Sequence, residues 1–115
     1  MKTLEKRTAD AALYDFDCST LLASGETVSS ITSLTGDKGG LTFGIPIVNT
    51  VAITYPDETI GAIGQVVQVR ISGGTIPVGQ TSILCPVRMV VVTSVGNTIE
   101  ATGVIRLMDH ASAVW

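Results

Sequence analysis

The segment Tyr14–Ser19 is the feature of this sequence that most constrains its fold. Its residues alternate between apolar and acidic or polar types, in the order Tyr-Asp-Phe-Asp-Cys-Ser. Successive side chains of a β-strand point to opposite faces of the sheet, whereas a helix repeats every 3.6 residues. A strict two-residue period therefore predicts a strand that buries Tyr14, Phe16 and Cys18 and exposes the residues between them.

Turns divide the rest of the chain into further short segments. Gly36–Gly40 and Ser94–Asn97 contain residues that tolerate a positive φ, which tight turns require. Pro86 cannot donate a hydrogen bond to a neighbouring strand, so the strand that contains it is expected to be an edge, or bulged, near that residue. Strands are predicted over residues 13–19, 26–32, 41–43, 48–55, 59–63, 66–72, 81–93 and 98–107. The predicted inner faces of the last two are Ile83, Cys85, Val87, Met89 and Val91, and then Ile99, Ala101, Gly103 and Ile105 or the opposite parity.

The number and spacing of these segments predict an all-β fold in one domain. About seven to nine short antiparallel strands favour an immunoglobulin-like β-sandwich, with a jelly roll as the runner-up. The sandwich is expected to span residues 13–109. Residues 1–12 mix both signs of charge without an apolar stripe and are expected to form an extended N-terminal arm, or a short helical turn over residues 5–12. Residues 110–115 are expected to form a tail.

The composition is more apolar than is usual for an isolated domain. Hydrophobic residues make up 45% of the 115 residues, charged residues only 15%, and the mean hydropathy is +0.46. A charged share of about 25% is typical, so we interpret the excess as surface that a partner covers. No apolar run approaches the roughly 20 residues of a membrane-spanning helix. The net charge of −3 argues against a nucleic-acid partner.

Cys18 and Cys85 are the two cysteines of the chain, and both fall at positions predicted to face the core. Residues 1–7 are charged and lack the apolar stretch of a signal peptide, so folding in the cytoplasm, where thiols stay reduced, is expected. Two buried free thiols are the favoured interpretation. A disulfide between them is the alternative that sequence leaves open.

No group of residues in the sequence specifies a reaction or a metal site. Asp15 and Asp17 share one face of a strand, but a catalytic or calcium pair needs further oxygens, which Asp57, Glu58 and Asp109 would supply only if the fold brought them close, so we interpret the two as a solvated face. His110 is the only histidine, which leaves the serines without a base. Gly36–Gly40 departs from a phosphate-binding loop because two glycines follow Lys38. We therefore predict a protein that is not an enzyme, with no catalytic, cofactor-binding or metal-binding residues.

Two stretches resemble a family of small proteins encoded in the structural operons of tailed phages. Residues 14–28, Tyr-Asp-Phe-Asp-Cys-Ser-Thr-Leu-Leu-Ala-Ser-Gly-Glu-Thr-Val, are similar to the family's opening of tyrosine, any residue, phenylalanine, aspartate, tryptophan and serine, with a later glycine–acid–threonine turn. Residues 67–75 are similar to the family's strand and Gly-Gly turn. The family's pattern also matches residues 79–81 and the closing hairpin through residues 94–96. Cys18 stands where the family usually has tryptophan, and residues 33–65 have no counterpart in it.

The resemblance implies an immunoglobulin-like component of a virion head, neck, tail or fibre. With the apolar composition, it leads us to expect a capsid decoration or cement subunit that binds the shell and neighbouring subunits. The alternative is a neck, tail or fibre component that acts as a host-surface or glycan-binding adhesion module. The expected location is the virion, after synthesis in the host cytoplasm.

The expected partners are the major capsid protein or the neck and tail proteins, together with copies of the chain itself. The candidate contacts lie at the two ends of the chain and at one loop tip: Leu4, Lys6, Arg7, Lys38, Val114 and Trp115. For Trp115, an anchor on a neighbouring subunit and packing against its own domain are both open, because tryptophan serves in interfaces and in cores.

Overall fold

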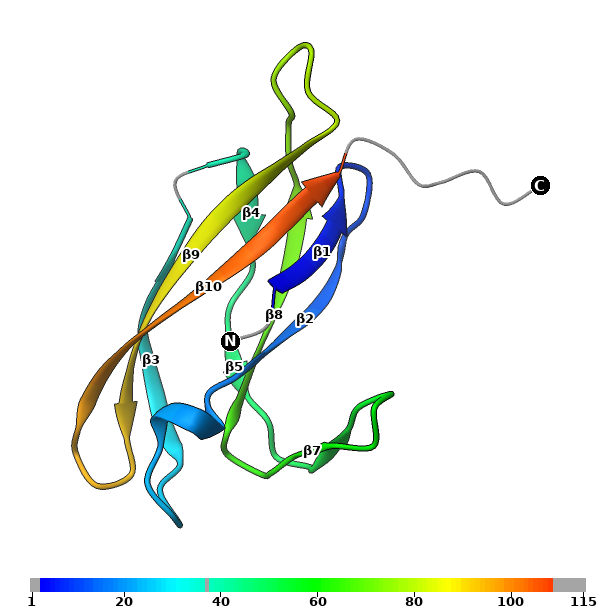
Figure 1. The fold of residues 1–115 in the computed structure, drawn as a ribbon. Helices are drawn as coiled ribbons and strands as arrows, with labels where there is room; N and C mark the ends of the chain where they lie inside the picture. Colours follow the sequence, from blue (N-terminus) through cyan, green and yellow to red (C-terminus); the bar gives the residue numbers. More distant parts are fainter. Residues whose placement is uncertain (1–2, 37, 109–115) are drawn as a thin grey trace.

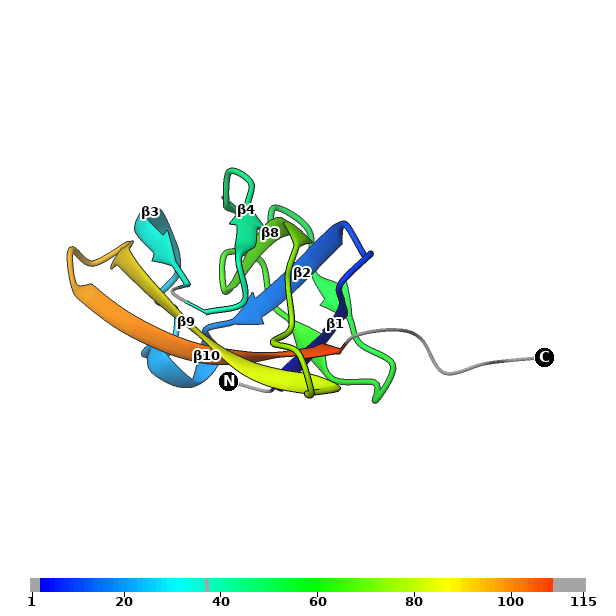
Figure 2. The ribbon, with the colours of Figure 1, turned by 90° about the horizontal axis from the view of Figure 1, so that it is seen from above.

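Two β-sheets pack face to face and form a sandwich (Figures 1 and 2). The structure is a computed structural model that describes residues 3–36 and 38–108. The first sheet has the order β1-β10-β9-β3, formed by β1 (Thr3–Arg7), β10 (Thr98–Met108), β9 (Ser82–Thr93) and β3 (Val28–Thr35). The second has the order β2-β8-β4, formed by β2 (Ala12–Asp17), β8 (Val66–Gly73) and β4 (Leu41–Phe43), and β5 (Ile47–Val48) also pairs with β8. A short hairpin of β6 (Ile53–Thr54) and β7 (Ile60–Gly61) and a 3-10 turn, Ser19–Leu21, complete the described elements.

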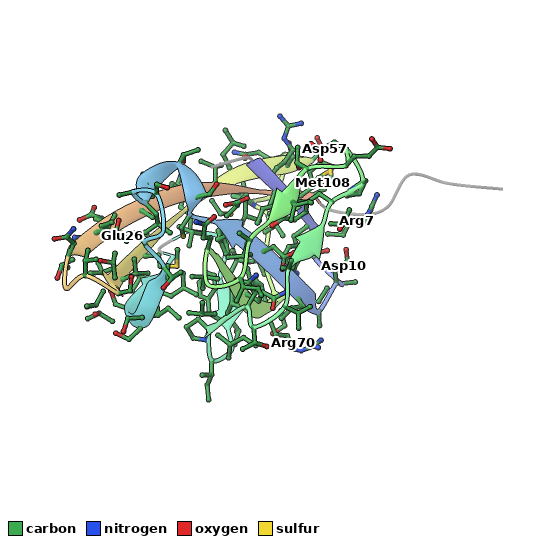
Figure 3. The ribbon with its side chains drawn as sticks, turned by 90° about the horizontal axis from the view of Figure 1, so that it is seen from below. Arg7, Asp10, Glu26, Asp57, Arg70 and Met108 are labelled. Carbon is green, nitrogen blue, oxygen red and sulfur yellow. The ribbon has the colours of Figure 1, made fainter. Side chains whose placement is uncertain are left out.

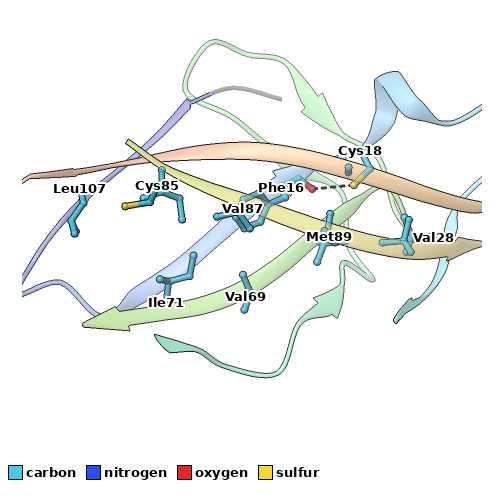
Figure 4. Close-up of a cluster of buried hydrophobic side chains, with 13 residues drawn as sticks. Phe16, Cys18, Val28, Val69, Ile71, Cys85, Val87, Met89 and Leu107 are labelled. Atoms are coloured by element: carbon cyan, nitrogen blue, oxygen red, sulfur yellow. Dashed lines mark hydrogen bonds between the residues drawn. The ribbon is translucent and has the colours of Figure 1, made fainter. Parts of the chain in front are cut away.

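The core lies between the sheets, where every second residue of the long strands points inward (Figure 4). The predicted inner face of β9 is confirmed, and β10 turns its odd-numbered residues inward, which is the first of the two parities considered. The all-β sandwich predicted from strand spacing is likewise confirmed, whereas its immunoglobulin-like connectivity stays a prediction. The buried apolar cluster consists of Phe16, Cys18, Val28, Val67, Val69, Ile71, Cys85, Val87, Met89, Val91, Ala101, Ile105 and Leu107.

Residues 3–7 belong to the first sheet, so the predicted arm over residues 1–12 is wrong for this stretch. β1 pairs in parallel with β10, while the other strand pairs are antiparallel. The side chain of Lys6 is only 1% exposed, and its Nζ donates hydrogen bonds to the carbonyl oxygens of Gly73 (2.5 Å) and Arg7 (2.8 Å). A lysine can bury its aliphatic stem when carbonyl groups receive its ammonium group. Because the charged Lys6 occupies an inward position, the pattern of apolar residues does not predict β1.

The strand predicted over residues 48–55 is divided in the structure. β5 ends at Val48 and β6 begins at Ile53, because the hydrogen bonds of Asn49 hold the chain in a turn at that point. The expectation for Pro86 is confirmed. β3 pairs with β9 only as far as Arg88, so within the described residues Pro86 has a partner strand on one side of β9 and none on the other.

The two cysteines lie at opposite ends of the core (Figure 4), and both are buried and free, as the favoured interpretation predicted. Burial, with a contribution from Asp17, raises the pKa of the Cys18 thiol to about 11. Burial also raises the pKa of the Cys85 thiol. The turn after β3 requires a glycine at position 39 for two reasons. The φ of Gly39 is +79°, and a Cβ there would come within 2.7 Å of the Cys85 sulfur.

Candidate interaction surfaces

The candidate contacts of β1 are more enclosed than the sequence predicts. Leu4 and Arg7 are half-buried, and Lys6 is buried, so the prediction of Lys6 as a surface contact is wrong. Burial lowers the pKa of Lys6, and the nearby Asp10 carboxylate opposes that effect. The backbone N–H of Arg7 donates to Asp10 Oδ2 (3.3 Å). Leu4 also lines a groove at the surface, described below.

Lys38 is exposed, as predicted, at the rim of an open hollow of about 400 Å³. The other lining residues are Gly39, Thr75, Ile76, Pro77, Gln80 and Ile83. A single charged group above an apolar floor does not specify a ligand. Val114 and Trp115 lie outside the described residues.

Exposed apolar side chains concentrate on residues 45–63, which we call the 45–63 segment. The described residues include ten exposed large apolar side chains, and five belong to this segment: Ile45, Ile47, Val51, Ile60 and Ile63. Ile45 is 89% exposed and Val51 is 70% exposed. Single exposed apolar residues are common on soluble proteins, and we interpret the five in this stretch of sequence as a candidate interaction surface.

One buried residue, Asn49, ties the two halves of the 45–63 segment together. Its Nδ2 donates to the carbonyl oxygens of Val51 and Ala62, both at 3.0 Å, and its Oδ1 accepts from the N–H of Val66 at 3.0 Å. Its own carbonyl accepts from the N–H of Gly64 at 3.0 Å. Polar groups therefore order this segment, and its exposed apolar side chains are not needed to hold it in place.

The β6–β7 hairpin packs against the start of β8, at the lower end of the molecule in Figure 1. Val66 has the outward parity of β8, yet it is fully buried because the hairpin covers it. At Gly61 a Cβ would lie 2.7 Å from Val66 Cγ2 and 2.8 Å from the Tyr55 hydroxyl. Only glycine permits an approach this close, so the sequence fixes the hairpin against the sheet.

A groove of about 690 Å³ follows the outer edge of β2. Its lining includes every residue from 13 to 17, together with Ser19 and Thr20. Successive side chains of a strand point to opposite faces, so an uninterrupted run of lining residues means that the groove runs along the edge of the strand. Leu4 of β1 lines one side, and residues of the hairpin region line the other: Tyr55, Asp57, Thr59 and Ile60.

The groove is acidic and contains a buried hydroxyl group. Asp15, Asp17 and Asp57 line it, and among residues 3–36 and 38–108 no basic side chain does so. Asp15 Oδ1 accepts a hydrogen bond from Gln68 Nε2 (3.0 Å). The Tyr55 hydroxyl is buried and has no hydrogen-bond partner among residues 3–36 and 38–108. Burial raises the pKa of Tyr55, and the charges of Asp17 and Asp15 add to that effect. The two aspartates interpreted as a solvated face are thus half-buried groups of a groove.

Two kinds of chemistry, metal binding and attack by a thiolate, can be judged from the described residues. Among residues 3–36 and 38–108, no three histidine, cysteine, aspartate or glutamate side chains gather where they could hold a metal ion. The raised pKa of the Cys18 and Cys85 thiols disfavours the nucleophilic thiolate. The prediction that the protein is not an enzyme stays a prediction.

Glu26, in the turn before β3, is a second polar anchor. Figure 3 shows Glu26 at one end of the molecule and Arg7, Asp10 and Asp57 at the other. Glu26 Oε1 accepts from the N–H of Ala23 (2.9 Å), and Oε2 accepts from Asn97 Nδ2 (3.2 Å). These hydrogen bonds, with one from the Thr93 side chain, lower the pKa of Glu26. They connect the turn before β3 to the β9–β10 hairpin, which is a structural role.

Comparison with known proteins gave no match, whether to a protein-family model, a curated protein sequence or a solved structure. In the part of the chain that the structure describes, no helix has the length and apolarity needed to cross a membrane.

Sequence reasoning missed the groove and the anchor of the 45–63 segment. It identified Asp15 and Asp17 but not Tyr55 or Ile60 beside them, because the hairpin that brings these two over β2 depends on a long-range contact at Gly61. A signal for Asn49 was present in the sequence, since an asparagine interrupts an otherwise apolar stretch.

Proposed function

We propose that the chain is a non-enzymatic structural protein of a tailed-phage virion, and most specifically a capsid decoration or cement subunit with an immunoglobulin-like fold. The observation that carries the proposal is the 45–63 segment, whose five exposed apolar side chains are held outward by polar anchoring. The low charged share of the sequence supports it, since covered surface needs few charges. The resemblance of residues 14–28 to the phage family is the reason for proposing a virion as the assembly to which the chain binds.

The mechanism is binding. Covering the exposed apolar side chains stabilises a contact by about 25 cal/mol for each Å² removed from water. A subunit of this size gains only a modest free energy from one such contact. Many copies on a shell, each in contact with the major capsid protein or the neck and tail proteins and with neighbouring copies, make modest contacts effective.

The alternative is an adhesion module of a neck, tail or fibre. Such a module usually presents aromatic residues at loop tips, because flat rings stack on sugars and anchor interfaces. Here the loops after β8 and between β9 and β10 expose Val78 and Val95. This favours a decoration subunit over an adhesion module.

The test is binding of the purified chain to particles of the encoding phage assembled without it. The informative variant is Ile45→Ser with Ile63→Ser, which removes two exposed side chains of the 45–63 segment. Val78→Ser with Val95→Ser is the matched control, since it makes the same change at exposed positions elsewhere. Deletion of residues 111–115 tests the tail. Deletion of residues 1–10 is unsuitable, because it removes β1 from the sheet.

Saturable binding to particles, weakened by the Ile45/Ile63 variant and retained by the control, is the expected result. Binding to host cells or glycans in place of particles would favour the adhesion module. Binding to neither would overturn the virion proposal.

A further inference from the structure

We propose that the outer edge of β2 is a strand-addition site for an extended polypeptide segment in which basic and apolar side chains alternate. This inference rests on the edge of β2 and does not depend on the proposed virion function, although Tyr55, Asp57, Thr59 and Ile60 of the 45–63 segment form the other wall of the groove. The two proposals can therefore fail separately, since one is tested with particles and the other with peptides.

Within the described residues, the backbone of β2 has hydrogen-bonding groups without a partner, which such a segment could use. β2 is the terminal strand of its sheet, and the N–H of Cys18 donates toward β8, to the carbonyl oxygen of Gln65 (2.9 Å). β2 and β8 stay in continuous antiparallel register, so the even-numbered residues of β2 all face β8. The odd-numbered residues Leu13, Asp15 and Asp17 therefore direct their N–H and C=O groups to the outer edge. This edge forms the floor of the 690 Å³ groove.

The other sheet edges carry features that discourage strand addition. The register of β3 against β9 shifts twice, which breaks its edge. The edge formed by β4 and β5 is interrupted by Gly44-Ile45-Pro46. β1 points a charged residue, Lys6, into the interior, which is a further device that protects edges. β2 has no bulge, glycine or proline over its six residues.

The negative charge of the groove favours an added segment with basic side chains. Among the described residues, three carboxylates and no basic side chain line the groove, and Asp15 and Asp17 form no ion pair. Two β2 edges from separate copies would bring these aspartates together, and that repulsion excludes a second copy as the occupant. An added strand whose outer-face side chains are lysine or arginine would place them against Asp15, Asp17 and Asp57.

The opposite face of the added strand would be apolar. Side chains of a strand alternate between faces, and the inner side of the groove is lined by Leu4, Tyr14 and Phe16. The alternation of basic and apolar residues in the occupant thus follows from the two sides of one groove.

The probe is a capped eight-residue peptide of alternating lysine and valine, and its dissociation constant is measured by fluorescence anisotropy with the full-length chain. We expect binding at low salt that weakens as salt is added, because the contact is electrostatic. The same peptide with glutamate in place of lysine is expected not to bind. Amide NMR shifts should localise to Leu13, Asp15 and Asp17. Binding of both peptides alike, of neither, or of neutral oligosaccharides in their place would overturn the proposal.

Two protein variants separate charge from backbone. Asp15→Asn with Asp17→Asn removes the charges and keeps the N–H groups, and it should weaken binding about tenfold or more. Glu100→Gln is the control, because it removes a carboxylate from the outer face of the other sheet and should have no effect. Asp15→Pro removes an N–H that faces outward, which an edge strand tolerates, and it should bind more weakly than Asp15→Asn.

N-methylated peptides give a test that requires no folded variant. Methyl groups on the backbone amides of one alternate set, the lysines or the valines, should abolish binding, while the other set is tolerated. Antiparallel addition directs the amides of residues opposite Asp15 and Asp17 to β2, whereas parallel addition uses their neighbours. The sensitive set therefore also reports the strand direction. Tolerance of both sets would show that no strand is added and would overturn the proposal.

Discussion

The long strands β8, β9 and β10 and the 45–63 segment use apolar residues in opposite ways. In the strands, the inward-facing valine, isoleucine, leucine and methionine side chains of the core are almost completely buried against the facing sheet. In the 45–63 segment, five of the same kinds of side chain face solvent, and a buried asparagine supplies the order. In the strands, apolar burial drives folding. In the 45–63 segment, the exposed apolar side chains do not contribute to the core, and we propose that they bind a partner.

This difference predicts that mutations will separate stability from binding. A change in the strands should lower the free energy of unfolding, because it opens a cavity in a close-packed core. A change of an exposed side chain in the 45–63 segment should leave that free energy almost unaltered. The anchors that hold the segment and the loops should fall between these limits.

The largest effect is expected for Ile105→Ala, at the centre of β10. Ile105 is fully buried, and truncation of a buried isoleucine to alanine costs about 2–5 kcal/mol of unfolding free energy. Urea denaturation followed by circular dichroism measures it. Arg106→Ala, the exposed neighbour on the same strand, is the control and should change stability by less than about 0.5 kcal/mol. Equal effects of the two substitutions would contradict the core assignment.

A smaller loss is expected for Asn49→Ala. The substitution removes three side-chain hydrogen bonds and leaves the N–H of Val66 and two carbonyl groups without that partner, at a cost of about 2–3 kcal/mol. Hydrogen exchange should accelerate at Gly64 and Val66 more than in β9. Thr50→Ala, at the exposed next residue, is the control. Uniform acceleration over the whole chain would show that Asn49 is not a local anchor.

The long strands could be predicted from the sequence because their signal is local. Val67, Val69 and Ile71 repeat with period two, and a strand with this period has only one way to bury its apolar face. The same reasoning placed Phe16 and Cys18 in the core and the odd residues of β9 inside. Strand boundaries in these regions follow the prediction closely.

The edges and the groove could not be predicted in this way, because they depend on contacts between distant residues. Lys6 is buried only because the carbonyl oxygen of Gly73, 67 positions away, receives its ammonium group. Asn49 organises its segment through Ala62 and Val66, and Gly61 brings the hairpin against the sheet. Period-two patterns carry no information on such partners.

Glu26→Gln tests whether the negative charge of Glu26, and not only its hydrogen bonds, stabilises the fold. Hydrogen bonds hold the folded-state pKa of Glu26 below its ordinary value of 4.5, so the carboxylate stabilises the fold above that pH, and this contribution is lost as the pH falls through the folded pKa. The variant should be less stable than the original chain at pH 7, and the difference should narrow on acidification toward pH of about 3. Thermal unfolding over this pH range measures the trend. Asn49→Ala, which removes no titratable group, should show a difference that does not depend on pH.

The smallest change in stability is expected for Ile45→Ser with Ile63→Ser. Both side chains are exposed, so their replacement should move the unfolding free energy by no more than about 0.5 kcal/mol for each. The same variant should bind less of an environment-sensitive hydrophobic dye, because it removes apolar surface, and should be the one that weakens particle binding. Val78→Ser with Val95→Ser, equally neutral for stability, should keep particle binding. If the Ile45/Ile63 variant instead lost several kcal/mol, these side chains would belong to the folding core, and the division between folding strands and a binding segment would be wrong.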